Sequence, residues 1–180
     1  MHSGETLRYA EDLFRYAMAL SRNRAEAEDL VQETYVRALK AMGGLRPNSN
    51  LKVWMFTILR NVWRNQLRKQ CTRPRIVELD NGEVFLDPPA ERSKDPHNLF
   101  VTNMEREHVR VAIEQLPIDF REIIVLREYE ELSYQEIAEL LDCPLGTVMS
   151  RLGRARARLR ILLSDALHPI PSLMDPDSGQ

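Results

Sequence analysis

The stretch CPLGTVMSRLGRARARLR, residues 143–160, carries five arginines and no carboxylate, although the whole chain has a net charge of −2. On a helical wheel with about 100° per residue, this stretch has one apolar face. The apolar face holds Val148, Leu152, Ala155 and Leu159. A second face holds cations and hydroxyls, namely Thr147, Ser150, Arg151, Arg154 and Arg158. The sequence therefore predicts an amphipathic helix whose exposed stripe attracts a polyanion.

Another predicted helix precedes this one, separated from it by a short turn. Ser133 and Glu136 have the spacing of a capping box, and Pro144 suits the first turn of the following helix. Two helices joined in this way are typical of a helix-turn-helix, whose second helix enters the major groove of DNA. Arginine bonds guanine bidentately, whereas serine and threonine bond bases or phosphates. From the wheel alone, a helical hairpin that serves only core packing remains the alternative.

Charge is sorted along the chain rather than mixed. Residues 34–77 hold ten basic side chains and no carboxylate, and residues 78–142 hold 17 acidic and six basic side chains. Residues 144–164 hold five arginines and no acid. Two basic blocks around an acidic middle indicate two polyanion-binding surfaces on separate modules. A chance distribution of charge over solvated helices is the alternative.

Helical periodicity dominates the chain and predicts an all-α protein of two small helical domains joined by a flexible linker. The expected boundaries are 1–71 for the first domain, 72–100 for the linker, 101–167 for the second domain and 168–180 for a disordered tail. Repeated prolines indicate the linker, although DNG at residues 80–82 also suits the turn of a small hairpin. Asn23 and Glu26 have the spacing of a helix cap in the first domain. Asp119 and Glu122 are expected to cap a helix in the second.

Patterns that would indicate secretion, a membrane span or catalysis are absent from the sequence. Residues 1–14 carry charges without the apolar core of a signal peptide, and no apolar run approaches the length of a membrane span. The four histidines have no metal-ligand spacing, and no metalloprotease, phosphate-loop or nucleophile-elbow motif occurs. We therefore predict a cytoplasmic protein that is not an enzyme and has no cofactor or metal. Cys71, beside a basic run, suits either an oxidant sensor or a spectator thiol.

Longer stretches of the chain resemble one family of transcription proteins. LPIDFREIIVLREYEELSYQEIAELLDCPLGTVMSRLGRARARLR, residues 116–160, resembles region 4 of bacterial sigma factors of the extracytoplasmic-function group, in the sigma-70 family. AEDLVQETYVRALKAM (residues 27–42) followed by NLKVWMFTILRNVWRNQLRK (residues 50–69) resembles region 2 of the same group. The two matches occur in the family's order and cover most of the chain. The resemblance implies a sigma factor that binds core RNA polymerase and directs promoter-specific transcription initiation.

In this family, region 4 reads the upstream −35 element of the promoter. The residues implied in this contact are Thr147, Ser150, Arg151, Arg154 and, on phosphate, Arg158. Two positions depart from a common pattern of the group. Met149 stands where many members carry a basic residue, and Gly153 stands where many carry a bulkier one. The base preference of relatives therefore does not transfer to this chain.

Region 2 is implied to read and open the −10 element. Melting needs cations along a single strand and a pocket for an extruded base. The residues that match this surface are Asn50, Lys52, Asn61, Arg64, Asn65 and Arg68. Trp54 aligns with a tryptophan of the family and is also in phase with the apolar stripe of its helix. Both a core position and base stacking are therefore open, and the core position is favoured.

The resemblance also names protein partners. The second predicted helix has a polar face that matches the family's docking surface for the coiled coil of the largest polymerase subunit. Its residues are Asp29, Gln32, Glu33 and Arg37. Two small modules on a linker have no evident means of silencing themselves, so the resemblance implies an anti-sigma factor that clamps both. The expected partners are core RNA polymerase, promoter DNA and an anti-sigma factor.

Two other classes of protein remain as alternatives. One is a helix-turn-helix regulator that binds duplex DNA without polymerase, which the resemblance to region 2 argues against. The other is an anti-sigma or adaptor protein that only imitates the surfaces of a sigma factor. Such a protein would bind polymerase or sigma factors without directing transcription from promoters.

Overall fold

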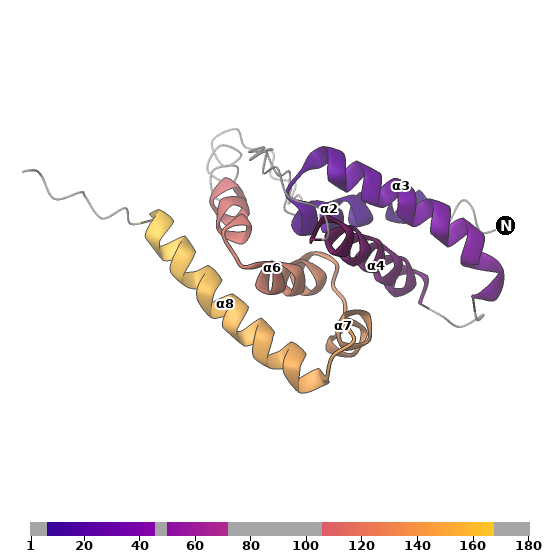
Figure 1. The fold of residues 1–180 in the computed structure, drawn as a ribbon. Coiled ribbons are helices and arrows are strands. Elements are labelled where there is room, and N and C mark those ends of the chain that lie inside the picture. Colours follow the sequence, from indigo (N-terminus) through magenta and orange to yellow (C-terminus); the bar gives the residue numbers. More distant parts are fainter. Residues whose placement is uncertain (1–6, 46–49, 72–105, 168–180) are drawn as a thin grey trace, which may run out of the picture.

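The structure is a computed structural model, and it describes residues 7–45, 50–71 and 106–167. These residues form helices and turns and no strand, which confirms the predicted all-α fold (Figure 1). The predicted linker, the hairpin considered within it and the predicted tail lie outside the described residues. The described residues up to 71 are called the N-terminal module below, and those from 106 onward are called the C-terminal module.

Three α-helices build the N-terminal module: α2 (Ala10–Ser21), α3 (Arg24–Ala41) and α4 (Leu51–Cys71). Short 3₁₀ turns lie at Leu7–Tyr9, before α2, and at Met42–Gly44, after α3. The three helices pack against one another in all three pairs. Their apolar stripes therefore enclose one small core.

Local signals fix the turn between α2 and α3. Arg22 has a φ of 58° and ends α2 in the left-handed conformation, with its N–H donating to the Met18 carbonyl at 2.9 Å. The Asn23 side chain then caps α3 by accepting a hydrogen bond from the Glu26 N–H at 3.0 Å. A polar side chain at this position satisfies one of the amides that a helix start leaves open. The predicted start of this helix is confirmed.

The C-terminal module begins with helical residues 106–114. It continues with α6 (Ile118–Ile124), the π-helical turn η3 (Val125–Tyr129), α7 (Tyr134–Leu141) and α8 (Leu145–Leu167). α8 packs on α6 and α7. In Figure 1, α8 lies on the side of α6 and α7 that faces away from α3.

Two predicted helix caps of this module have opposite outcomes. Ser133 and Glu136 form a complete capping box at the start of α7: the Ser133 Oγ accepts from the Glu136 N–H at 3.2 Å, and the Glu136 carboxylate accepts from the Ser133 N–H at 2.7 Å. The predicted cap by Asp119 and Glu122 is wrong. Pro117 precedes α6 and makes no side-chain cap, and Glu122 is buried because it points to the N-terminal module.

The two modules share one continuous core. α2 contacts α6 and η3, while α4 contacts α7. Buried apolar side chains from both modules, such as Leu13 and Ile123, belong to the same cluster. The Tyr16 and Phe56 rings stack in it with their centroids 5.1 Å apart. The chain is therefore closed on itself in this structure, which the sequence did not predict.

Candidate nucleic-acid interface

α8 presents the arginine stripe that the sequence predicted. Val148, Leu152 and Ala155 are buried and hold the helix against α6 and α7. Of the predicted −35 residues, Ser150, Arg154 and Arg158 are exposed, while Thr147 and Arg151 are half-buried. None of the three arginines forms an ion pair within the part of the chain that the structure describes. The charges of Arg154 and Arg158 therefore face solvent, and Arg151 lies at the edge of the exposed face.

The exposed face of α8 also contains residues outside the arginine stripe. Gly146, Met149 and Gly153 are exposed, and the Met149 side chain has 54% of its surface accessible. A Cβ atom added at either glycine would meet no atom within 4 Å. The centre of the exposed face therefore lies between the predicted stripe and the opposite flank. Met149 is a candidate contact residue that reasoning from charge alone leaves out.

Arg156 on the opposite flank is engaged within its own module. Its guanidinium pairs with the Glu128 carboxylate in η3, with Nε and Nη2 at 3.0 and 2.6 Å from the same oxygen. This pairing raises the pKa of Arg156 above its ordinary value. Arg156 therefore serves as a control for the stripe arginines, because it lies on the same helix but its charge is already paired.

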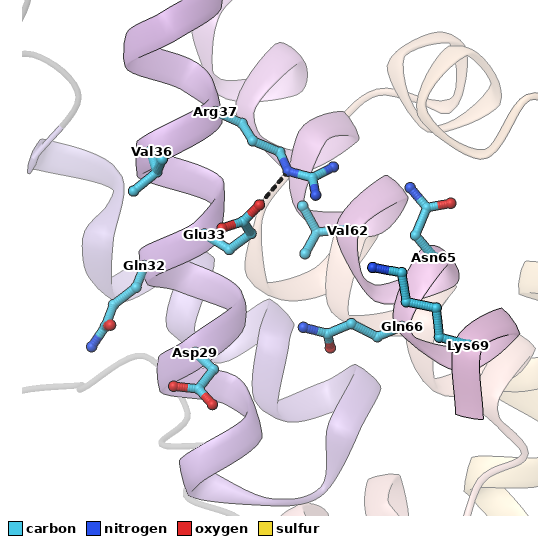
Figure 2. Close-up of a pocket in the computed structure, with 9 residues that line it drawn as sticks. All are labelled: Asp29, Gln32, Glu33, Val36, Arg37, Val62, Asn65, Gln66 and Lys69. Carbon is cyan, nitrogen blue, oxygen red and sulfur yellow. Dashed lines mark hydrogen bonds and ion pairs between the residues drawn. The ribbon is translucent and has the colours of Figure 1, made fainter. Parts of the chain in front are cut away.

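The polymerase-docking residues predicted on α3 line one groove with residues of α4 (Figure 2). The groove has a volume of about 400 Å³. Its lining comprises Asp29, Gln32, Glu33, Val36 and Arg37 of α3, and Val62, Asn65, Gln66 and Lys69 of α4. Glu33 and Arg37 form an ion pair of 2.6 Å across one helical turn. The structure thus brings all four predicted docking residues together.

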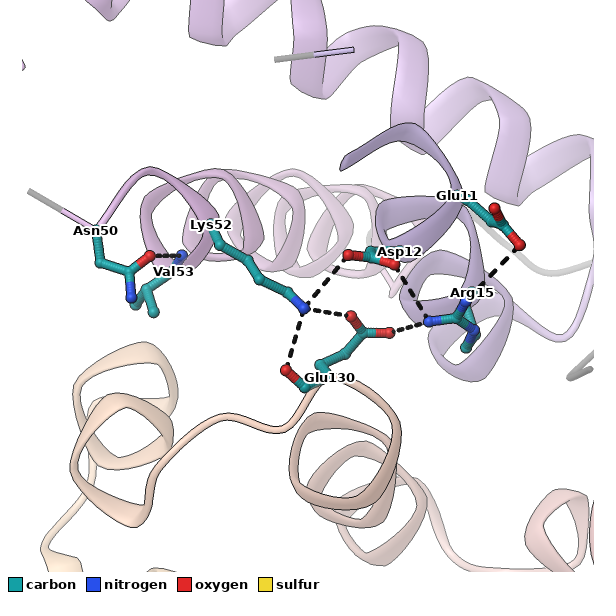
Figure 3. Close-up of polar contacts among 7 residues, drawn as sticks. All are labelled: Glu11, Asp12, Arg15, Asn50, Lys52, Val53 and Glu130. Carbon is teal, nitrogen blue, oxygen red and sulfur yellow. Dashed lines mark hydrogen bonds and ion pairs between the residues drawn. The ribbon is translucent and has the colours of Figure 1, made fainter. Parts of the chain in front are cut away.

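The predicted −10 residues divide between two surfaces. Asn61, Arg64, Asn65 and Arg68 are exposed along α4, and Asn65 also lines the groove of Figure 2. Asn50 and Lys52, at the start of α4, instead face the C-terminal module (Figure 3). Trp54 is half-buried and packs against the core, in line with the favoured core position. The side chain of Cys71 lies outside the described residues.

Lys52 lies at the centre of a cluster of charges between the modules (Figure 3). Its Nζ is 3.0 Å from Glu130 Oε2, 3.0 Å from the Glu130 carbonyl and 3.3 Å from Asp12 Oδ2. Arg15 pairs with the other oxygen of Glu130 at 2.7 Å. Burial lowers the pKa of Lys52, but its contacts with Glu130 outweigh this and raise it. Burial also raises the pKa of Glu130, whose side chain has no exposed surface.

A second polar contact between the modules is deeper. Glu122 Oε1 accepts hydrogen bonds from the Tyr16 hydroxyl at 2.7 Å and from Arg60 Nε at 2.8 Å. Burial, and then the nearby Glu122 charge, raise the pKa of Tyr16 well above its ordinary value. The sequence offered one signal for this contact, because Glu122 lies in the run FREIIVL, where a carboxylate among apolar residues needs a partner. The sequence did not indicate that Tyr16 and Arg60 would be the partners of Glu122.

Comparison with known proteins agrees with this architecture. Residues 7–72 match the family model for sigma-70 region 2, and residues 106–159 match the model for sigma-70 region 4. The ECF RNA polymerase sigma factor EcfG of Rhodopseudomonas palustris is 39% identical over 148 residues, which cover 82% of this chain and 77% of that protein. The ECF RNA polymerase sigma-E factor of Escherichia coli is 39% identical over 134 residues, covering 73% of this chain and 70% of that one.

Two solved structures are similar in fold. The sigma factor RpoE of Bartonella quintana, in complex with the anti-sigma factor NepR, superposes with a TM-score of 0.69 at 34% identity, covering 89% of this chain and 95% of that one. CnrH, in complex with the cytosolic domain of CnrY, gives a TM-score of 0.61 at 25% identity, covering 89% of this chain and 86% of that one.

Two helical modules, one with an exposed cationic helix and one with a polar groove, together with the matches to sigma-70 regions 2 and 4, define a transcription initiation factor of the sigma type. The chain belongs to the extracytoplasmic-function group of the sigma-70 family. It is therefore a sigma factor that directs promoter-specific transcription initiation. None of the helices within the described ranges has the length and apolar character needed to cross a membrane.

Proposed function

We propose that α8 reads the −35 element through Thr147, Ser150, Arg151 and Arg154, with Arg158 on phosphate. The observation that carries this proposal is the set of three stripe arginines that have no ion pair within the described residues, while Arg156 on the opposite flank is paired. Arg151 and Arg158 can bond guanine or phosphate without first breaking an internal ion pair, and Arg154 would exchange only its contacts of 3.3 and 3.5 Å with Ser150 on its own helix. Residues at the start of the second helix of a helix-turn-helix are those that reach base edges.

The −10 strand follows α4 in this proposal. Exposed amides and guanidinia occur at Asn61, Arg64, Asn65 and Arg68, so they form a polar strip along one helix. Cations with interleaved hydrogen-bonding groups suit a single strand. Asn50 and Lys52, at the start of α4, form a second part of this surface, on the side that faces the C-terminal module. Domain boundaries follow the same division, with residues 1–71 acting on the −10 element and residues 101–167 acting on the −35 element.

Core polymerase is proposed to occupy the groove between α3 and α4. Asp29, Gln32, Glu33 and Arg37 supply its polar contacts, and Val36 supplies an apolar one, with 44% of its surface exposed. A polar rim around a small apolar contact is typical of protein interfaces. Asn65 lies in this groove, so it is placed to contact both polymerase and the promoter strand.

An anti-sigma factor is the further partner that we propose. The two solved neighbours are sigma factors held by NepR and by CnrY, and the first is 34% identical to this chain. An inhibitor of this kind would cover the docking groove and so compete with polymerase. We also propose that the chain acts in the cytoplasm and catalyses no reaction itself, since the polymerase supplies the chemistry.

In vitro transcription with core polymerase tests the division of labour. Arg154→Ala should weaken binding to the −35 element by roughly 1–3 kcal/mol and relax its base preference. The matched control Arg156→Ala removes the same charge from the other flank of α8 and should leave both unchanged. Asn61→Ala should instead preserve −35 binding and reduce the permanganate reactivity of unpaired thymines. Equal loss of closed-complex binding in Arg154→Ala and Asn61→Ala, without a separate melting defect, would contradict the proposal.

A pull-down with core polymerase tests whether specific promoter binding by the full chain depends on the polymerase, as it would not for a regulator that acts alone. The full chain should retain core polymerase and should bind promoter duplex specifically only in its presence. Specific duplex binding by the isolated chain at moderate salt would count against the proposed roles, because small arginine patches give mainly nonspecific, salt-sensitive affinity.

A further inference from the structure

We propose that the chain holds itself in a closed form in which carboxylates of the C-terminal module occupy the groups that start the −10 strand surface. Glu130 occupies Lys52 (Figure 3), and Glu136 occupies Asn50. This inference rests on the proposed role of Lys52 and Asn50 in strand binding. Packing of the two modules and binding of promoter DNA would then compete for Lys52 and Asn50.

Lys52 has no donor left for a phosphate in the closed form. An ammonium group has three N–H donors and no acceptor. Three oxygens surround the Lys52 Nζ at 3.0 to 3.3 Å: two of Glu130 and one of Asp12. Asp12 belongs to the same module as Lys52, whereas Glu130 comes from the other module. Separation of the modules therefore removes two of the three oxygens and frees the ammonium for an external anion.

Asn50 is engaged at both ends of its amide. The Oδ1 accepts from the Val53 N–H at 3.3 Å and so caps α4, while the Nδ2 donates to Glu136 Oε1 at 2.6 Å. The same Glu136 closes the capping box of α7 through its other oxygen. One carboxylate thus bridges the starts of two helices, which both carry partial positive charge.

The carboxylates stand where a phosphate group of the promoter would bind. The start of a helix with a nearby lysine is a favourable place for an anion, because exposed amides and the ammonium act together. α4 is 21 residues long and begins one residue before Lys52. Glu130 and Glu136 supply negative charge at this place from within the chain. The closed form therefore satisfies the −10 surface in the absence of DNA.

The deeper contact holds the closed form together but leaves it reversible. Glu122 and Glu130 are each paired with groups of the N-terminal module, and both side chains are almost wholly buried. Buried ion pairs roughly break even against the solvation that the separated groups regain in water. Glu130 Oε2 is near Lys52 but lacks a well-aligned hydrogen bond. The intact polar contacts therefore add little net free energy to the closed form beyond the apolar core that the modules share, and polymerase or DNA shifts the balance by binding the open form.

Spin-label distances and strand binding by the full chain test this proposal together. Nitroxides at Ala25→Cys and Ala157→Cys, in a chain whose two native cysteines are serine, report the separation of α3 and α8. A fluorescent single-stranded −10 oligonucleotide reports strand affinity. Glu130→Gln removes the charge that holds Lys52, and the matched control Glu128→Gln removes the same charge from a pair within the C-terminal module.

Tyr16→Phe provides a second opening variant that keeps the volume of the core. It removes only the hydroxyl that donates to Glu122. Loss of one hydrogen bond to a charged group should shift the ratio of closed to open chain roughly tenfold or more. Glu130→Gln and Tyr16→Phe should therefore both lengthen the label distance and tighten strand binding, and Glu128→Gln should do neither.

Two results overturn the proposal in distinguishable ways. Unchanged label distances in both opening variants would show that these contacts do not hold the modules together. Longer distances without tighter strand binding would show that Lys52 and Asn50 do not bind the strand, so the proposed −10 assignment would fail as well. Lys52→Ala in the Glu130→Gln chain should cancel the gain in strand affinity, and retention of that gain would also exclude masking of Lys52.

Discussion

Arg121→Met tests the contact that ties the start of α6 to the end of α2. Arg121 is buried, and its guanidinium donates to three backbone carbonyls: Ala19 in the N-terminal module, and Glu114 and Leu116 in its own. Burial, and then the nearby Arg22, lower the pKa of Arg121 to about 10. Methionine fills similar space without the charge or the donors.

The magnitude follows from which carbonyls lose their donor. Arg22 also donates to the carbonyls of Glu114 and Leu116, so these two keep a partner. The Ala19 carbonyl loses the Arg121 donor, and a buried acceptor left without a partner costs about 1–3 kcal/mol. The variant no longer buries a guanidinium, which offsets part of this cost. We therefore expect the free energy of unfolding to fall by about 1 kcal/mol, toward the lower end of this range.

Urea unfolding followed by circular dichroism measures this change. The urea concentration at half unfolding should fall, with little change in the slope of the free energy of unfolding against urea, since the folded chain buries similar surface. Arg24→Met is the control, because the Arg24–Glu28 pair of 2.9 Å is exposed and such pairs contribute about 0.3–0.5 kcal/mol. An unchanged or higher midpoint in Arg121→Met would refute the reasoning, since desolvation of the guanidinium would then outweigh its hydrogen bonds.

Three further outcomes are expected. Met149 is exposed and is expected to contact a thymine methyl group of the −35 element. Deoxyuridine in place of thymine should therefore weaken −35 binding by polymerase that carries the native chain but not by polymerase that carries Met149→Ala, and equal weakening in both would exclude that contact. Ser133→Ala should lower the free energy of unfolding by about 1 kcal/mol in urea melts, and a change within error would show that the capping box contributes nothing. Hydrogen bonds with Ser133 lower the pKa of Glu136 in the folded chain, so its contribution to stability is full above the ordinary pKa of 4.5 and is lost as pH falls through the lowered value. The free energy of unfolding of the native chain relative to Glu136→Gln should therefore decrease as pH falls below 4.5, and an increase would contradict the capping contact.

Features that depend on neighbours in sequence could be predicted. The capping box at Ser133 and Glu136 needs only a spacing of three residues, and the apolar face of α8 needs only helical periodicity. The resemblance to a family supplied the docking residues of α3, and the structure places them in one groove. These signals are local or carried by whole motifs, so the sequence contains them directly.

Features that depend on contacts between distant residues could not be predicted. The spacing of Asp119 and Glu122 is that of a cap, yet Glu122 pairs with Tyr16, which lies 106 residues earlier in the chain. Lys52 and Glu130 are likewise 78 residues apart. The sorting of charge predicts two surfaces for external polyanions, whereas Lys52 and Arg60 of the first basic block pair with Glu130 and Glu122 of the acidic block. The expectation that the chain has no internal means of silencing itself stays a prediction, against which the closed form proposed above stands.

The ion pairs at Lys52 and Arg15 change how the chain responds to electrolyte. Each phosphate contact by a free cation normally releases a condensed counterion from DNA, so the number of contacts sets the steepness with which affinity falls as salt rises. A lysine that exchanges an internal carboxylate for a phosphate begins from a pair that salt also weakens. If Lys52 binds the strand as proposed, affinity for the strand should fall less steeply with salt than the number of phosphate contacts alone would give. Glu130→Gln should then restore the full steepness, even as it tightens binding at low salt.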